Sequence, residues 1–302
     1  MTETLIFATR PSRLAQWQTE SIVKQLKIAW PTLNCKTLVI TTQGDKVLDR
    51  PLPEIGGKGL FTLELEQALR SKEVDAAVHS LKDLPVENSP GLIVGLIPER
   101  EDLRDVLICS AGYTLETMPS GSVVGTSSFR RQAQLLIQRP DLQVRSIRGN
   151  VETRIAKSKT VAYDAIVMAA AGVKRLGLER EITSYFPAEV ILAAPGQGAL
   201  GVQCRQDDLA TQRLLAVLED KSARLTTTAE RSFLAALGGG CSLPVAAQAI
   251  LQGDQIYLHG LVAAADGSRV IRVQAKGNDP QLLGENLAKQ ALDQGAGELL
   301  NL

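Results

Sequence analysis

The basic side chains of this chain are concentrated between Ser122 and Thr160. This stretch holds eight basic residues and two acids, 8 − 2 = +6, whereas the whole chain balances 33 basic against 33 acidic residues. Six of the eight are arginines, whose planar fork of donors suits bidentate binding of carboxylate or phosphate. A solvated surface position is the simpler interpretation for any one of them, but the group predicts an anion site. Its members are Arg130, Arg131, Arg139, Arg145, Arg148, Arg154, Lys157 and Lys159.

The positions of these arginines sharpen the prediction. The segment 126–131, Thr-Ser-Ser-Phe-Arg-Arg, follows a predicted strand and opens a predicted helix, so backbone N–H groups, hydroxyls and two guanidiniums converge there. Arg148 follows another strand, and ligands of open α/β sheets bind at the carboxyl ends of strands. A nucleic-acid surface would give the same charge. It would more often come with interleaved aromatics and a positive overall balance, whereas aromatics are 4% here and the net charge is zero.

A carboxylate, Asp83, directly follows a short buried strand in the segment His79-Ser-Leu-Lys-Asp-Leu-Pro85. In a strand-end loop beside Lys82 it is a candidate general acid/base or cation stabiliser. Taken alone, the segment favours a turn-forming aspartate before a proline. His79 is interpreted as a partly buried histidine without a catalytic role.

One cysteine, Cys241, stands in the glycine-rich segment Gly238-Gly-Gly-Cys-Ser-Leu-Pro244. Three glycines leave its backbone and thiol accessible near a helix end, which suits a reactive or covalently modified cysteine. Cys35, Cys109 and Cys204 form no CxxC pair and are interpreted as buried small apolar residues. The spacing predicts neither a metal site nor a disulfide framework.

Two glycine motifs resemble nucleotide-binding sequences. The segment 196–201 fits G-x-G-x-x-G, but a proline precedes it and Val202-Gln-Cys204 is typical of a strand, so the match is interpreted as accidental. Gly56-Gly-Lys-Gly59 lacks the Ser/Thr of a phosphate loop. It is expected to be a flexible basic loop that closes over a site, with Phe61 behind it.

The elements that must position these residues alternate between strand-like and helix-like runs, which favours an α/β fold with parallel or mixed sheets. The helix over 12–29 stops before Pro31, and the glycines at 238–240 end a helix over 226–237, for which Thr227 and Glu230 fit a capping box. A meander of three strands and a final helix complete the chain. The predicted strands are 5–8, 35–42, 74–78, 92–97, 122–125, 143–147, 165–168, 246–251, 255–263 and 268–276, and the other predicted helices are 61–71, 128–138, 150–157, 169–176 and 280–294.

The pattern predicts three domains. The first α/β domain comprises 1–98 plus about 196–218, the second comprises 99–195, and a smaller C-terminal α+β domain, 219–302, carries Cys241. No apolar run of about 18 residues exists and the start lacks a secretion signal, so no membrane contact and a cytoplasmic location are expected.

Taken in order, these motifs resemble those of hydroxymethylbilane synthase, also called porphobilinogen deaminase, over nearly the full length. Each motif is weak alone, and their succession is highly specific. They are Ala8-Thr-Arg-Pro-Ser-Arg-Leu-Ala15, Thr41-Thr-Gln-Gly-Asp45, Gly56-Gly-Lys-Gly-Leu-Phe61, His79-Ser-Leu-Lys-Asp-Leu-Pro85, Gly125-Thr-Ser-Ser-Phe-Arg-Arg131, Arg148-Gly-Asn150, Tyr163-Asp-Ala-Ile166, Gly196-Gln-Gly198 and Gly239-Gly-Cys241.

The resemblance implies two domains of the periplasmic-binding-protein type (type II) and a third that bears the cysteine. Cys241 would hold one dipyrromethane cofactor per chain through a thioether. Four porphobilinogens would be added head to tail onto this primer, each losing ammonia, before water releases the linear tetrapyrrole for porphyrin, haem and chlorophyll biosynthesis. Asp83 matches the catalytic acid, which assists loss of the amino group and stabilises cationic azafulvene and pyrrolenine species. The resemblance further implies a monomer that passes its product to uroporphyrinogen-III synthase.

The acetate and propionate arms of the pyrroles would give the arginine cluster its ligand. Besides Cys241, the implied cofactor-binding residues are Ser80, Lys82, Asp83, Thr126, Ser128, Arg130, Arg131 and Arg148. The implied substrate-binding residues are Arg10, Ser12, Lys58, Phe61, Arg148, Arg154, Arg175 and Gln197.

Some positions depart from the family pattern. Arg13 takes the place of a proline, Glu152 stands where a small or neutral residue is common, and the segment 157–160 lacks the familiar Leu-Asp. Contacts at Arg154 are therefore less well defined by the resemblance. Arg13 either adds an anion contact or faces solvent.

Two other functions have the same charge pattern. A two-lobed solute-binding protein would share fold and arginines, but it would carry an export signal and would have no need of Cys241 in a glycine loop. A nucleic-acid binder would use 130–159, would depend steeply on salt, and would leave Asp83 without a role.

Overall fold

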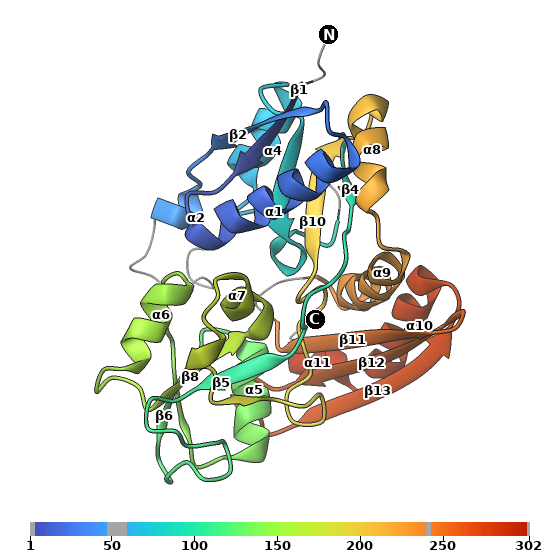
Figure 1. The fold of residues 1–302 in the computed structure, drawn as a ribbon. Coiled ribbons are helices and arrows are strands. Elements are labelled where there is room, and N and C mark those ends of the chain that lie inside the picture. Colours follow the sequence, from blue (N-terminus) through green and yellow to red (C-terminus); the bar gives the residue numbers. More distant parts are fainter. Residues whose placement is uncertain (1–3, 47–58, 88, 240–242, 301–302) are drawn as a thin grey trace. The chain divides into compact units, whose positions relative to one another are not determined.

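The computed structural model describes residues 4–46, 59–87, 89–239 and 243–300 (Figure 1). They form two compact units. The first contains the described residues among 1–49, 57–101 and 199–224, and the second those among 102–198 and 225–302. No helix in these described ranges has the length and apolar character needed to cross a membrane.

The first unit is built on a five-stranded mixed sheet with the order β2-β1-β3-β10-β4. β1 runs parallel to β2 and β3, and β10 runs antiparallel to β3 and β4. The strands are β1 (Thr4–Thr9), β2 (Asn34–Val39), β3 (Ala76–Ser80), β4 (Leu92–Leu96) and β10 (Leu200–Arg205). The helices are α1 (Arg13–Ala29), α2 (Gln43–Lys46), α4 (Leu63–Arg70), α8 (Leu209–Leu215) and the 3-10 turns η1 (Leu81–Asp83) and η3 (Ala216–Leu218).

Alternation along the strands supplies both faces of this sheet with apolar side chains. Phe7 and Val78 face α1 and pack with its Ile22 and Leu26. The neighbouring positions, Ala8 among them, face α4 and pack with its leucines. A sheet covered on both faces presents its strand ends as the place for a site.

The second unit contains another five-stranded mixed sheet, with the order β7-β6-β8-β5-β9. β6 runs parallel to β7 and β8, whereas β5 runs antiparallel to β8 and β9. The strands are β5 (Asp105–Ile108), β6 (Val123–Gly125), β7 (Gln143–Arg145), β8 (Ala165–Ala169) and β9 (Ser184–Tyr185). The helices are α5 (Phe129–Gln138), α6 (Val151–Ser158), α7 (Ala170–Arg175) and the 3-10 turn η2 (Glu179–Glu181).

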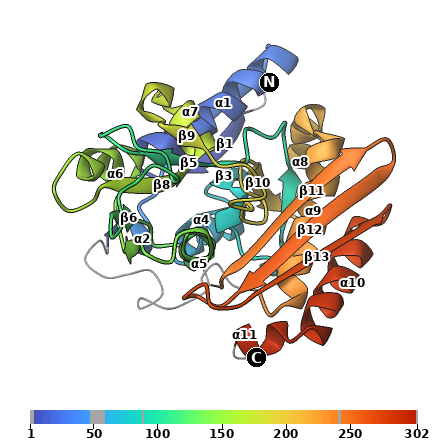
Figure 2. The same ribbon diagram turned by 90° about the horizontal axis from the view of Figure 1, so that it is seen from below.

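The C-terminal part of the second unit is an antiparallel sheet, β11-β12-β13, with helices. Figure 2 shows the three strands side by side with α10 along them. Ala133 of α5 packs in one apolar cluster with Ala246, Leu261 and Ala263, which joins this sheet to α5. The elements are α9 (Lys221–Ala236), whose residues 221–224 belong to the first unit, β11 (Val245–Gln252), β12 (Gln255–Ala263), β13 (Val270–Gly277), α10 (Pro280–Asp293) and α11 (Ala296–Leu300).

The α/β class and the smaller C-terminal α+β part are confirmed. The predicted start of the helix at Thr226 is wrong, because α9 begins at Lys221 and the capping-box pair lies inside it. Glu230 instead accepts hydrogen bonds from the backbone N–H groups of Gly196 and Ala249, each over 2.8 Å. The dismissal of the G-x-G-x-x-G match is confirmed, since the segment runs into strand β10. Strands β5 and β9 and helices α2, α8 and α11 were not expected from the sequence.

Candidate active site

Asp83 lies at the end of η1, directly after β3. The leucines on either side of the Lys82–Asp83 pair are buried, and the N–H of Leu81 donates to the carbonyl of Ala199 over 3.0 Å. Because these leucines anchor the turn, Asp83 is exposed and Lys82 half-buried. Ser80 accepts a hydrogen bond from Nε2 of Gln18 on α1 over 2.9 Å.

Arg10 follows β1, the parallel neighbour of β3, so it and Asp83 belong to the same edge of the sheet. Its guanidinium is paired with the Asp45 carboxylate and lies 4.1 Å from the centre of the Phe61 ring. Burial alone would raise the pKa of Asp45, but hydrogen bonds from Arg10 and Thr42 outweigh it and lower that pKa. The Asp45 carboxylate and the Phe61 ring therefore hold the guanidinium of Arg10 in place.

Ser12 is the N-cap of α1, where its hydroxyl accepts the N–H of Ala15 over 3.3 Å. This local role follows from the preference of serine for that position. Arg13 is exposed in the first turn of the helix.

His79 lies on β3, one residue before Ser80, and is buried. Burial first, and then the charge of Arg10, lower its pKa to about 4. The imidazole is therefore neutral at physiological pH. Its Nε2 has no hydrogen-bond partner among the described residues. On the same side of the sheet Gln203 donates to the buried carboxylate of Glu66 over 3.2 Å.

In the second unit, the segment 126–128 follows β6 and leads into α5. Ser127 connects this segment to Ile147. Its hydroxyl donates to the carbonyl of Ile147 over 2.7 Å and accepts the N–H of Ile147 over 3.0 Å. These bonds join the loop after β6 to the loop after β7, which carries Arg148. Thr126 is buried and bonds through its N–H to the carbonyl of Arg145.

Ser128 is the N-cap residue of α5, yet its side chain makes no capping hydrogen bond. The first turn of α5 also contains no acid. The N–H groups in the first turn of this helix therefore receive no side-chain cap from Ser128.

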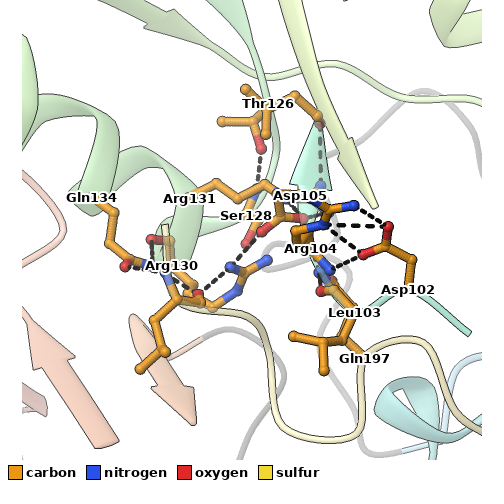
Figure 3. A network of polar contacts seen from close by, with 12 residues as sticks. Asp102, Leu103, Arg104, Asp105, Thr126, Ser128, Arg130, Arg131, Gln134 and Gln197 are labelled. Carbon is orange, nitrogen blue, oxygen red and sulfur yellow. Dashed lines mark hydrogen bonds and ion pairs between the residues drawn. The ribbon is translucent and has the colours of Figure 1, made fainter. Parts of the chain in front are cut away.

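Arg130 and Arg131 on α5 are both buried, with 4% and 7% of their surface exposed, and share one buried carboxylate, Asp105 on β5 (Figure 3). Arg130 donates from Nη1 to Asp105 over 2.7 Å and to the carbonyl of Leu192 over 2.6 Å. Arg131 donates to Asp105 from Nε over 3.0 Å and from Nη2 over 2.7 Å. Its Nη1 reaches the carbonyl of Val167 at 3.2 Å.

The electrostatics of this cluster favour the charged forms. Burial alone would raise the pKa of Asp105, but the two guanidiniums and their hydrogen bonds hold it well below its usual range. Burial lowers the pKa of Arg130, and the Asp105 charge opposes that change. The buried cluster of Arg130, Arg131 and Asp105 therefore has a net charge of about +1.

Gln197 and Arg175 hold the turn formed by residues 195–198. The fully buried Gln197 donates from Nε2 to the carbonyl of Leu103 over 2.8 Å and to Asp105 over 2.9 Å. Arg175, buried on α7, donates from Nη2 to the carbonyl of Gly198 over 2.6 Å. Gly196 and Gly198 adopt positive φ values of 74° and 86°, which favour glycine.

Arg148 and Arg154 are half-buried, and they flank the N-terminus of α6. Asn150 caps that helix by accepting the N–H of Thr153 over 2.9 Å. Lys157 donates to the carbonyl of Arg148 over 3.0 Å.

The predicted site residues therefore gather at two sheet edges, one in each unit. Arg10, Ser12, Phe61, Ser80, Lys82 and Asp83 lie at the first, beyond β1 and β3. Thr126, Ser128, Arg130, Arg131, Arg148, Arg154 and Arg175 lie at the second, after β6, β7 and β8, with Gln197 bonded to the arginine pair's carboxylate. Lys58 and Cys241, with most of the expected basic loop 56–59, lie outside the described residues.

The sequence analysis assigned no site role to Asp105 or Ser127, and it gave Glu230 only a role in a capping box. The available signal for Asp105 was an acid placed directly before the apolar run Val106–Cys109. Within the described ranges, no cluster of three His, Cys, Asp or Glu side chains is arranged to bind a metal ion. Cys204 is buried, which raises its pKa to about 11, and Cys109 is buried as well, whereas Cys35 is only half-buried.

Two mixed sheets with helices on their faces, one of them with arginine-rich strand ends, define an α/β protein. Residues 5–213 match the family model for the porphobilinogen deaminase dipyromethane cofactor binding domain, and residues 224–293 match that for the porphobilinogen deaminase C-terminal domain. The chain belongs to the porphobilinogen deaminase family.

Curated relatives agree with this membership. The chain is 49% identical to a porphobilinogen deaminase of Roseiflexus sp. (strain RS-1), over 99% of each chain. It is 47% identical to one of Brevibacillus brevis, over 97% of this chain and 95% of the other. Among solved structures, the methionine-binding protein MetQ is similar over 73% of this chain and 92% of that chain, with a TM-score of 0.46 and 10% identity. The expected α/β class, with two larger sheets and a smaller C-terminal sheet, is confirmed by the sheets described above.

Proposed function

We propose that this chain is a hydroxymethylbilane synthase, which joins four porphobilinogens head to tail with loss of ammonia and releases a linear tetrapyrrole with water. The observation that carries the proposal is the match of residues 5–213 to the family's cofactor-binding domain, which spans both sheet edges described above. The matching C-terminal domain, 224–293, includes Cys241. A solute-binding protein would have no use for this domain or for Asp83.

The residues at the second sheet edge fit a dipyrromethane cofactor. Its acetate and propionate arms are anions, and this edge offers the uncapped start of α5, the Ser128 hydroxyl and the buried guanidinium of Arg130. The cofactor supplies a pyrrole carbon to which the first substrate is joined. We assign Ser80, Lys82, Asp83, Thr126, Ser128, the arginine pair and Arg148 to holding it, with the thiol of Cys241 as its covalent anchor.

Asp83 is the proposed catalytic residue. When the aminomethyl group of porphobilinogen leaves as ammonia, positive charge develops on the pyrrole, and a carboxylate held in place stabilises that charge. Asp83 is suited to this task because its turn is anchored by buried leucines while the carboxylate itself remains exposed. It is also placed to move a proton at the departing nitrogen.

The substrate's own carboxylates need cationic partners, and arginine is the residue best suited to them. We assign Arg10, Ser12, Lys58, Phe61, Arg148, Arg154, Arg175 and Gln197 to the substrate and the growing chain. Arg10 is the best supported, because Asp45 and the Phe61 ring hold its guanidinium at the edge that carries Asp83.

The mass of the purified protein tests the proposal. The parent is expected to exceed its sequence mass by a two-ring pyrrole adduct, and the Cys241→Ser variant is expected to have its sequence mass. Porphobilinogen consumption is measured on the same samples. A parent without adduct, or an adduct that survives the substitution, would refute the proposed function.

We also propose that the enzyme works as a monomer in the cytoplasm and passes its product to uroporphyrinogen-III synthase. The support is the absence of a membrane-crossing helix among the described residues. The linear tetrapyrrole also needs an enzyme that closes it. Light scattering at assay concentration is expected to give a mass near 32.4 kDa. A doubled mass would contradict the monomer.

A further inference from the structure

The segment Gly196-Gln-Gly-Ala-Leu-Gly201 has glycines at three positions, and backbone conformation explains only the first two. Gly196 and Gly198 adopt positive φ values, whereas Gly201 does not. Gly201 lies inside strand β10, where it is buried and pairs with His79 of β3. A glycine in an extended strand weakens that strand, and it often marks a place where another part of the structure approaches closely.

The close approach at Gly201 comes from the Asp83 turn, residues 81–84. A Cβ atom added to Gly201 would lie 2.9 Å from Cδ1 of Leu81 and 3.2 Å from Cδ1 of Leu84, whereas ordinary contacts of such an atom lie at 3.4–4 Å. These two leucines begin and end the turn. The surface of β10 that a side chain would cover is therefore occupied by both leucines that anchor the turn.

The two leucines have little room to move aside. Leu81 is fully buried and Leu84 is 3% exposed, and both belong to one apolar cluster with Ile97, Ala199 and Ala223. The backbone is fixed as well, because the N–H of Leu81 donates to the carbonyl of Ala199 over 3.0 Å and the N–H of Leu84 donates to the carbonyl of Leu81 over 3.2 Å. Since protein interiors are close-packed and transmit strain, a side chain at position 201 would displace the whole turn.

We propose that Gly201 is a positioning residue for Asp83. Because it has no side chain, Leu81 and Leu84 pack directly against β10, and this contact fixes where the Asp83 carboxylate stands. The inference rests on the proposed function, in which that carboxylate stabilises the developing positive charge. Such stabilisation requires a preorganised group, and a displacement of about 1 Å can lower a rate about 10²-fold. The last glycine of the motif thus acts on catalysis through the turn.

Two alanine variants separate this role from a general effect on packing. Gly201→Ala crowds the Asp83 turn. Gly95→Ala, on β4 of the same sheet, crowds Cys204 instead, because its Cβ would lie 2.6 Å from the Sγ atom. Both variants are expected to lower the melting temperature, since overpacking destabilises a core.

Only Gly201→Ala is expected to change the reaction. Its kcat per chain that carries the adduct is expected to fall about tenfold or more. Its KM and its adduct fraction are expected to stay close to the parent values, because the groups assigned to the substrate and the cofactor are not substituted. Porphobilinogen consumption gives kcat and KM, and intact mass gives the adduct fraction. In Gly95→Ala all three quantities should match those of the parent.

A second substitution removes the crowded atom itself. Leu81→Val deletes the Cδ1 atom that the new Cβ would meet. The double variant, Gly201→Ala with Leu81→Val, is therefore expected to have a higher kcat than Gly201→Ala alone. Hydrogen exchange supplies a readout that needs no turnover. Exchange at the amides of residues 81 and 84 is expected to rise more in Gly201→Ala than in Gly95→Ala, and to fall again in the double variant.

The outcomes separate the inference from the proposed function. A parent that carries no adduct and consumes no porphobilinogen defeats the proposed function, and the inference with it. With an active parent, three results overturn the inference alone: Gly201→Ala keeps the parent's kcat or loses its adduct, Gly95→Ala loses as much kcat, or the double variant gains nothing over Gly201→Ala. If Gly201→Ala does not fold, the double variant decides. A folded and active double variant supports the inference, and one that also fails to fold overturns it.

Discussion

Gln197 donates a hydrogen bond from Nε2 to Asp105 over 2.9 Å, although 92 residues separate them in the chain. The neighbouring Gly196 donates its N–H to Glu230 of α9 over 2.8 Å. Two buried acids therefore hold consecutive residues of the same turn, Asp105 from β5 and Glu230 from α9. This turn therefore connects α9 to the strand that bears Asp105. The segment with Cys241 follows α9 in the chain.

The Asp83→Asn substitution tests the catalytic assignment. The amide has the same shape but no charge to oppose the developing cation, so turnover is expected to fall about 10²–10³-fold. The adduct on Cys241 is expected to remain, and intact mass checks this while porphobilinogen consumption gives the rate. Glu73→Gln, at an exposed acid of the same unit, is the control. Turnover at the parent rate in Asp83→Asn would remove Asp83 from the mechanism.

The Asp105→Asn substitution removes the only acid bonded to the buried arginine pair in the described structure. Two guanidiniums would then share a buried place without a counter-charge, and the unfolding free energy is expected to fall by about 3–5 kcal/mol. Chemical denaturation measures it. The control is Asp141→Asn, at a surface ion pair with Arg139, where no measurable change is expected. Equal stabilities of the two variants would contradict a buried ion network.

The low pKa of the Asp105 carboxylate predicts how the stability of the protein changes at low pH. Its folded pKa lies below the unfolded one, so its contribution to stability is complete above the unfolded pKa and is lost as pH falls through the folded value. The parent is therefore expected to lose stability below about pH 4, relative to Asp105→Asn. Between pH 5 and 8 the difference between the two proteins should be constant, and a difference that varies in this range would contradict the low pKa.

The Glu230→Gln substitution tests the tie between the turn and α9. Two carboxylate oxygens accept the N–H groups of Gly196 and Ala249, whereas an amide has one acceptor oxygen and turns its NH2 toward the other donor. A loss of about 1–3 kcal/mol in unfolding free energy is expected. Hydrogen exchange at Gly196 and Ala249 should be faster. Glu285→Gln on the exposed side of α10 is the control, and equal effects of both would contradict the buried role.

Local signals in the sequence were enough to predict much of this fold. Ser12 and Asn150 stand directly before the helices they were expected to begin and cap them, because the preference for these residues at an N-cap acts within one turn. Gly238 and Gly239, with φ values of 90° and 54°, follow α9 as expected. Strand-end positions of the arginines followed from the same local pattern.

What the sequence could not supply is the identity of distant partners. Nothing near Arg130 in the chain indicates that Asp105, 25 residues away, occupies its Nη1. Glu230 formed a plausible capping box with Thr227, yet α9 extends upstream to Lys221 and the carboxylate serves two distant N–H groups. In both cases a tertiary contact overrides or adds to the local preference, and sequence periodicity contains no information on it.

His79 predicts a pH dependence of a different kind. Its folded pKa is about 4, against about 6.5 in the unfolded chain, so only the unfolded state gains a proton as pH falls between these values. The unfolding free energy is expected to fall by about 3 kcal/mol from pH 7 to pH 4 on this account. The measurement is the unfolding free energy of the parent and of His79→Gln, which lacks this titration, across the same range. The control is the same substitution at the other histidine of the chain, exposed His259. Identical slopes for the parent and His79→Gln would mean that His79 gains its proton at the same pH in the folded and unfolded states, and would contradict the lowered folded pKa.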